Sequence, residues 1–105
     1  MLRGMDLTFP INLVGHREWM DSGYALDLAR GDVITRDGEV LGTWRVVDYD
    51  PAVPDDSGGR YEFVPNGQDA AMLTEEFAYL DYRAHRGLAL SRLVQAIREW
   101  YEARP

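Results

Sequence analysis

The dipeptide Asp37-Gly38 lies between two segments that favour strands, and it constrains the fold more than any other short pattern in the chain. A two-residue type I′ turn needs a positive φ at both central positions, which glycine adopts without steric cost and aspartate tolerates. Because strand residues pair at equal distances from such a turn, the dipeptide predicts the register of a β-hairpin over residues 32–49. The predicted pairs are Arg36–Glu39, Thr35–Val40, Ile34–Leu41 and Val33–Gly42.

Side chains alternate between the two faces of a strand, so this register also predicts which hairpin residues enter the core. We expect the buried face to carry Val33, Val40, Trp44 and Val46. The opposite face would carry Ile34, Leu41, Arg45, Val47 and Tyr49, together with the Arg36–Glu39 pair.

Further strands are indicated on both sides of this hairpin. Residues 60–64 are rich in aromatic and β-branched types, and Pro65-Asn66-Gly67 ends the run, which predicts a third strand of a β-meander. Residues 51–59 contain two prolines and two glycines and are expected to form a loop. Two weaker runs, over residues 7–14 and 24–29, would add strands before the hairpin.

The last part of the chain has helical periodicity. At 100° per residue, the apolar side chains of residues 88–102 form one continuous arc, which is typical of a helix that covers a core. Upstream, Leu73, Phe77, Leu80 and Ala84 follow helical spacing and predict a shorter helix over residues 69–84, with a break at Gly87. The aromatic residues between 76 and 82 would also suit a strand. The arc contains Ala89, Leu90, Leu93, Val94, Ala96, Ile97, Trp100 and Tyr101.

These elements predict an α+β fold in which an antiparallel sheet, a β-meander with its hairpin turn at Asp37-Gly38, is packed on one face by C-terminal helix or helices. A length of 105 residues suits a single domain, 1–105. Contents of 46% hydrophobic and 28% charged residues are ordinary for a folded protein.

Two absences from the sequence restrict its chemistry. There is no cysteine, so disulfides, thiolate metal sites and cysteine nucleophiles are excluded. All 11 basic residues are arginine, and the lack of lysine excludes P-loop phosphate binding and Schiff-base chemistry.

The charge is acidic and uneven. The net charge is −7, and residues 1–82 hold 16 carboxylates against 6 arginines, whereas residues 83–105 hold 2 against 5. Such a balance opposes direct binding of nucleic acid or anionic lipid and favours basic partners. The chain shows no secretory signal and no apolar run long enough to cross a bilayer, so we expect a cytoplasmic protein.

Candidate catalytic and metal sites are weak. The two imidazoles, His16 and His85, would need nearby carboxylates such as Asp81 to bind a metal, and no serine lies in a nucleophile motif. The aspartates between residues 48 and 56 lack the order of a calcium loop. Arg83 and Arg86 would suit a phosphate or carboxylate. We therefore predict no cofactor, no metal and no enzymatic activity.

Aromatic residues make up 11% of the chain, and exposed tyrosines favour protein interfaces. We expect the tyrosines at 49, 61, 79 and 82 to lie near the surface. The leading hypothesis is an acidic interaction module that docks on a basic surface of a partner protein and, in a sharper form, is a nucleic-acid mimic, an inhibitor that masks a nucleic-acid-binding site. The predicted binding residues are Asp37, Glu39, Asp48, Tyr49, Asp50, Asp55, Asp56, Tyr61 and Glu62.

Two alternatives remain at this point. The first is a small enzyme or ligand-binding protein that uses His16 and His85 with nearby aspartate and arginine residues. The second is a structural or assembly subunit, a homo-oligomer in which Ile34, Leu41 and Val47 are buried against another copy.

Overall fold

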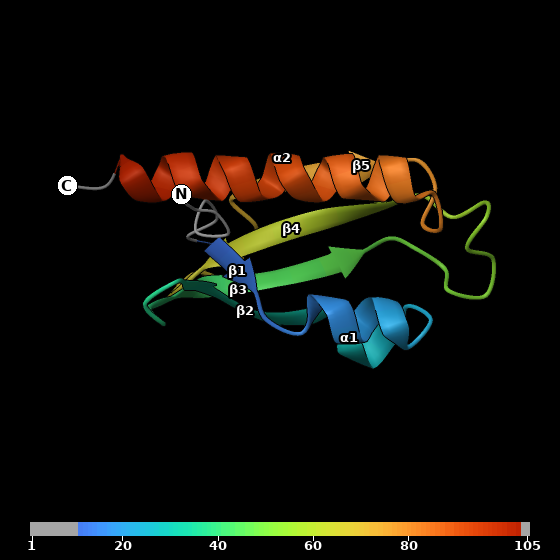
Figure 1. Ribbon diagram of the computed structural model, residues 1–105, viewed down its shortest axis with the longest axis horizontal. Coiled ribbons are helices and arrows are strands. Elements are labelled where there is room, and N and C mark those ends of the chain that lie inside the picture. Colours follow the sequence, from blue (N-terminus) through green and yellow to red (C-terminus); the bar gives the residue numbers. More distant parts are fainter. Residues whose placement is uncertain (1–10, 104–105) are drawn as a thin grey trace, which may run out of the picture.

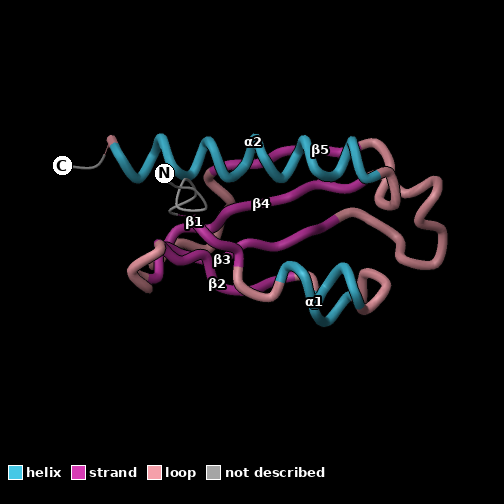
Figure 2. The backbone as a smooth tube through the Cα atoms, in the orientation of Figure 1, coloured by secondary structure: helices cyan, strands magenta, loops and turns pink. Residues whose placement is uncertain are grey.

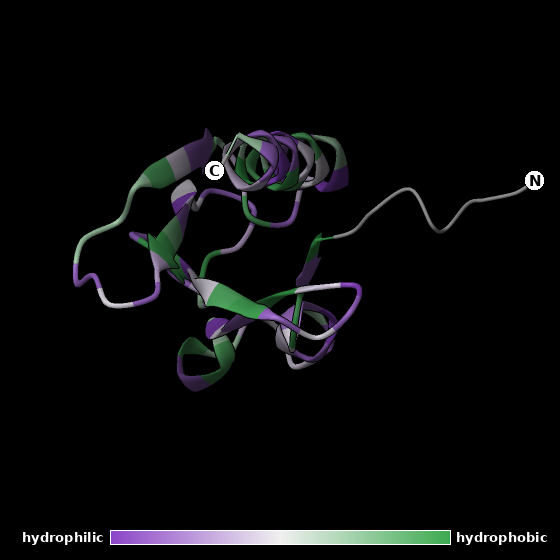
Figure 3. Cartoon of the chain, turned by 90° about the vertical axis from the view of Figure 1, so that its left-hand side faces the viewer, coloured by the Kyte–Doolittle hydropathy of each residue, from purple (hydrophilic) through white to green (hydrophobic). Residues whose placement is uncertain are grey.

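Five antiparallel strands and a long C-terminal helix form the computed structural model, which describes residues 11–103 (Figure 1). The sheet order is β1-β2-β3-β4-β5, so each strand pairs with its neighbour in the sequence, and α2 contacts β5, β4 and β1. Figure 2 shows α2 running along the sheet, and Figure 3 looks along α2 at the sheet curling beneath it. The predicted α+β class is therefore confirmed. The elements are β1 (Ile11–Leu13), α1 (His16–Asp21), the 3₁₀ turn η2 (Leu26–Leu28), β2 (Arg30–Thr35), β3 (Val40–Val47), β4 (Gly59–Pro65), β5 (Leu73–Phe77) and α2 (Arg83–Glu102).

The β2–β3 hairpin forms, but its turn is one residue longer than predicted. Gly38 N–H donates to the Thr35 carbonyl and Thr35 N–H donates to the Glu39 carbonyl, both at 2.9 Å, and of the turn residues only Gly38 has a positive φ, 92°. This is a type I turn followed by a left-handed glycine, the usual three-residue hairpin loop. Asp37 therefore does not adopt the left-handed conformation that a type I′ turn requires.

The longer turn changes the pairing near the hairpin tip. Val33 pairs with Gly42 as predicted, whereas Ile34 pairs with Val40, and Leu41 is the extra residue of a β-bulge. A bulge shifts the alternation of faces by one residue. Val40 is consequently 45% exposed and Leu41 only 3%, the reverse of the prediction, while Trp44 and Val46 are buried as expected.

Residues 69–84 do not form the predicted helix. Leu73–Phe77 instead pair with β4 as the edge strand β5, with Leu73 opposite Phe63 and Phe77 opposite Gly59. The helix α2 begins at Arg83 and continues through Gly87, which does not break it. A glycine in a helix interior costs about 1 kcal/mol, less than the apolar burial that the following turns provide.

Of the two weaker strand predictions, one is partly confirmed. Ile11–Leu13 form β1, Val14 lies in the turn that follows, and residues 7–10 of that run lie outside the described residues. The run over residues 24–29 is not a strand, because it contains the turn η2, and β2 begins only at Arg30. The predicted strand over residues 60–64 and the loop before it are both present.

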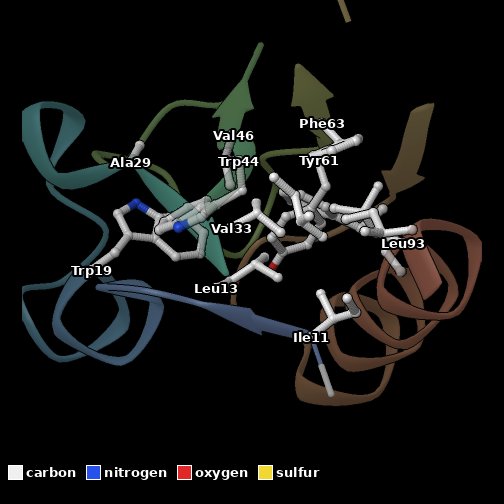
Figure 4. Packing of buried hydrophobic residues seen from close by; sticks show 14 of the residues in the cluster. Ile11, Leu13, Trp19, Ala29, Val33, Trp44, Val46, Tyr61, Phe63 and Leu93 are labelled. Carbon is white, nitrogen blue, oxygen red and sulfur yellow. The ribbon is translucent and has the colours of Figure 1, made fainter. Parts of the chain in front are cut away.

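The core lies between the inner face of the sheet and the two helices (Figure 4). Trp19 of α1 meets Trp44 and Tyr61 edge to face, with ring centroids 6.2 and 6.3 Å apart. Trp44 Nε1 donates to the Val14 carbonyl at 2.8 Å, and a Cβ on Gly31 would collide with that carbonyl, so this close approach requires glycine. From α2, Ala89, Leu93 and Ile97 are buried, as the helical arc predicts.

Candidate protein-docking surface

Three connections meet at one end of the molecule, which we call the loop end: residues 22–28, 48–58 and 78–82 (Figure 1). The β3–β4 loop is held to the β5–α2 connection because Leu80 N–H donates to the Ser57 carbonyl at 2.6 Å and Asp81 N–H to the Pro54 carbonyl at 3.3 Å. Two of the three connections therefore have fixed positions relative to each other.

Tyr49 attaches the same loop to the third connection. Its hydroxyl donates to the Tyr24 carbonyl at 2.8 Å and accepts from Trp19 Nε1 at 3.0 Å. The ring is half-buried, and this burial raises the pKa of its hydroxyl above the ordinary value. Tyr49, a predicted binding residue, thus positions the loop end from beneath and offers only part of its ring to solvent.

The loop carries four of the predicted binding carboxylates. Asp50, Asp55 and Asp56 are exposed and, within residues 11–103, take part in no ion pair. Asp50 accepts from Ala52 N–H at 2.9 Å, which orders the first turn of the loop. Asp48 is also exposed, but Arg60 neutralises it at 2.8 Å. The loop therefore presents three uncompensated charges on an ordered backbone.

Exposed aromatic rings lie on the β5–α2 connection, which is hydrogen-bonded to this loop. Tyr82 is 59% exposed and Tyr79 is 40% exposed, and both rings pack with each other and with His85 at centroid distances of 5.3 to 5.7 Å. The prediction that these two tyrosines lie at the surface is confirmed. Rigid, amphipathic rings of this kind supply contact area at interfaces at low cost in side-chain entropy.

Arg86 connects the aromatic and acidic parts of the loop end. Its guanidinium donates to the Tyr24 hydroxyl at 2.8 Å and to the Leu80 carbonyl at 3.0 Å, while the Tyr24 hydroxyl donates to Asp81 at 3.1 Å. Sequence reasoning missed this chain of contacts. It placed the helix start beyond Arg86, whereas α2 begins at Arg83 and its first turn reaches back over the preceding connection.

Two predicted binding residues are not at the surface. Tyr61 is fully buried, because it lies on the inner face of β4 opposite Val46. Glu62 is only 7% exposed, between Arg45 Nε at 2.6 Å and Arg60 Nε at 3.0 Å. Burial alone would raise the pKa of Glu62, but the hydrogen bonds from the two arginines outweigh it and lower that pKa. The prediction that Tyr61 and Glu62 lie on a docking surface is therefore wrong, because both side chains are buried.

The β2–β3 turn, which carries Asp37 and Glu39, lies at the other end of the molecule (Figure 1). Tyr101, in the last turn of α2, donates its hydroxyl to Glu39 at 3.0 Å, whereas the first turn of α2 borders the loop end. A 20-residue helix is about 30 Å long. The structure therefore does not bring the turn carboxylates together with those of the loop.

The residues of the two alternative hypotheses are also separated. His16 is buried, with Nε2 2.8 Å from the Tyr61 hydroxyl, while His85 is exposed and packs on the two surface tyrosines. Within residues 11–103, no three histidine, cysteine or acidic side chains are grouped to hold a metal ion. Leu41 is buried in the core, so it does not join Ile34 and Val47 in an exposed apolar patch.

The fold and this surface define a class, a small α+β protein with an ordered, acidic and tyrosine-bearing end. Comparison with protein-family models, with curated proteins and with solved structures gives no match. Among the described helices, none combines the length and the apolar character needed to cross a membrane.

Proposed function

We propose that the loop end is a docking surface for the basic face of a partner protein, and that the chain acts in the cytoplasm as a non-enzymatic interaction module. The observation that carries the proposal is the backbone hydrogen bonding of two connections. One carries the exposed carboxylates Asp50, Asp55 and Asp56, and the other carries the exposed rings of Tyr79 and Tyr82. Carboxylates attract a basic surface, and the rings supply contact area once it arrives.

Order in the loop supports the same proposal energetically. Binding loses free energy when flexible loops must become ordered, and a preformed loop avoids much of that loss. The hydrogen bonds that Leu80 and Asp81 make to the loop backbone hold it in place before any partner arrives. The carboxylates would then meet arginine or lysine side chains without rearrangement.

In its sharper form, the proposal is that the partner binds nucleic acid and that the loop carboxylates occupy its phosphate-binding positions, which would make the protein an inhibitor that mimics nucleic acid. A row of carboxylates competes for the same cationic groups that phosphates use. Binding of the protein and of nucleic acid to this partner would then be mutually exclusive.

The test uses two variants of equal net charge as bait in host extract. The first, Asp50→Asn/Asp55→Asn/Asp56→Asn, removes three charges from the loop end. The matched control, Asp37→Asn/Asp69→Asn/Glu99→Gln, removes three charges elsewhere. We expect the wild-type and control proteins to retain the same partner, the loop variant to lose it, and binding to weaken between about 50 and 200 mM salt.

A partner that binds the loop variant as tightly as the wild type would contradict the proposal. For the sharper form, the protein is titrated into a complex of the purified partner with its DNA or RNA. Failure of excess protein to release the nucleic acid would remove the mimic interpretation and leave docking alone.

A further inference from the structure

A cavity of about 270 Å³ lies between β1 and α2, away from the loop-end carboxylates. Its apolar walls are Ile11 and Leu13 of β1 and Leu90 and Val94 of α2, and the polar residues Asn12, His16 and Ser91 also line it. Figure 4 shows Ile11 and Leu13 on the strand that faces the helix carrying Leu93. Apolar walls with a few polar groups are typical of small-molecule sites.

The polar group of greatest interest is His16. It is 7% exposed and, with partners among residues 11–103, makes one hydrogen bond, from or to the fully buried Tyr61 hydroxyl at 2.8 Å. Burial, together with the nearby charge of Arg86, lowers the pKa of His16 to about 4, so the imidazole is neutral at pH 7. A neutral imidazole and a phenol each carry one polar hydrogen.

One of these two hydrogens has no acceptor among residues 11–103. If Tyr61 donates to Nε2, the hydrogen on Nδ1 of His16 is left over; if Nε2 donates, the hydroxyl hydrogen of Tyr61 is left over. Buried donors are nearly always satisfied, by protein, water or ligand. His16 is the member of the pair that lines the cavity, which favours the arrangement with Nδ1–H as the free donor.

We propose that this cavity binds a small neutral molecule with an apolar body and one carbonyl oxygen, which accepts the ring N–H of His16. A cavity of about 150 Å³ holds benzene, so this one would accommodate about ten non-hydrogen atoms. A neutral carbonyl fits because the cationic Arg86 favours an electron-rich atom near His16, whereas an ionised ligand would lose more solvation on entering apolar walls.

The probes are acetophenone and α-methylstyrene, which have the same shape but carry a carbonyl oxygen and a methylene group at the same position. Both are titrated while the amide resonances of residues 11–13 and 90–94 are followed by NMR. We expect acetophenone to bind with a Kd of about 1 mM or tighter and about fivefold more tightly than α-methylstyrene, because only the ketone accepts a hydrogen bond.

Two substitutions make the assignment specific. Val94→Phe fills the cavity from a half-buried position of α2 and should abolish binding of both probes, whereas Gln95→Phe, at the adjacent exposed position, should leave it unchanged. His16→Phe should remove the preference for the ketone. The loop variant Asp50→Asn/Asp55→Asn/Asp56→Asn should bind acetophenone like the wild type, so this site and the docking surface succeed or fail separately.

Three outcomes would overturn the proposal. The first is no shift of these resonances with either probe, which would mean that the cavity holds water only. The second is unchanged binding to Val94→Phe, which would place the probe elsewhere. The third is equal affinity of the wild type for both probes, which would exclude His16 as the donor.

Discussion

Tyr61 and Glu62 are neighbours on β4, and their side chains are buried on opposite faces of the sheet by opposite means. Tyr61 points inward, where aromatic rings and the neutral imidazole of His16 surround it. Glu62 points outward, where two arginines from its own and the adjacent strand enclose it. Ring packing therefore buries Tyr61 on the inner face, and ion pairs with two arginines bury Glu62 on the outer face.

This difference predicts how each face responds to mutation, pH and salt. A packed site loses dispersion contacts and leaves a void when a side chain is truncated. A charged site that remains near solvent loses a smaller, screened interaction. The following experiments test the contrast, in order of decreasing effect.

Truncation of the inner residue should have the largest effect. Tyr61→Ala should lower the free energy of unfolding by about 3–5 kcal/mol, because it removes a large ring from the core and leaves His16 without its hydrogen-bond partner. Urea denaturation at pH 7 measures the loss. Tyr82→Ala, at an exposed position, should change stability by less than about 0.5 kcal/mol. Similar losses in the two variants would contradict the packing account of the inner face.

Acid should weaken the inner face before it affects the outer one. The pKa of His16 is about 4 in the folded protein and 6.5 in the unfolded chain, so between these values the unfolded chain binds more protons. Stability should therefore be constant with respect to His16 above pH 6.5 and should fall by about 3 kcal/mol as the pH drops to 4.

The measurement is a series of urea titrations between pH 4 and pH 7.5, made on the wild type and on His16→Phe. The variant has no imidazole to protonate at this position, so the decline over this interval should be smaller by the amount assigned to His16. Parallel curves for the two proteins would show that other groups cause the decline.

Neutralising the outer residue should have a moderate effect. Glu62→Gln should cost about 1–2 kcal/mol at pH 7, since the arginines on either side are about one-third exposed and water screens part of the interaction. Because the pKa of Glu62 lies below its ordinary value of 4.5, the carboxylate contributes stability above that value and loses it as the pH falls through the lowered pKa.

The control is Glu76→Gln, an exposed position on the adjacent strand β5, which should have little effect. Thermal unfolding at low and high salt separates the two variants further. The stability difference between wild type and Glu62→Gln should shrink at high salt, whereas an unchanged difference would mean that packing, not charge, holds Glu62.

The smallest effect tests the type of the β2–β3 turn. The turn sets the register of the hairpin, and the register determines which hairpin residues face inward. Gly38→Ala places a side chain in the left-handed conformation and should cost about 1 kcal/mol. Asp37→Ala should be nearly neutral, because Asp37 is not left-handed. A two-residue turn would instead make Asp37→Ala costly as well. Chemical denaturation of both variants measures the difference.

These contrasts also explain which features could be predicted from the sequence. The hairpin and the C-terminal helix were predictable because turn residues and helical periodicity are local signals. The strand β5 was not, since the spacing of Leu73, Phe77 and Leu80 suits a helix, and only pairing with β4 decides otherwise. Long-range pairing overrides local preference in such segments.

The candidate site was predictable only in part. A run of aspartates beside prolines and glycines correctly indicated an exposed loop. Its position next to Tyr79 and Tyr82 depends on backbone hydrogen bonds to Ser57 and Pro54, which no local pattern encodes. Alternation along β4 required Tyr61 and Glu62 to face opposite sides, yet the burial of Glu62 depends on Arg45, which lies 17 residues away.

The bonds from Leu80 and Asp81 to the loop have a consequence for the newly made chain. Translation produces residues 48–58 before residues 78–82, so on the ribosome the aspartates emerge without the anchors that later hold them. The loop end can take its final shape only when residues 78–82 have left the exit tunnel. Recognition by a partner would therefore begin once these anchors have formed, and not on a shorter nascent fragment that ends before residue 78.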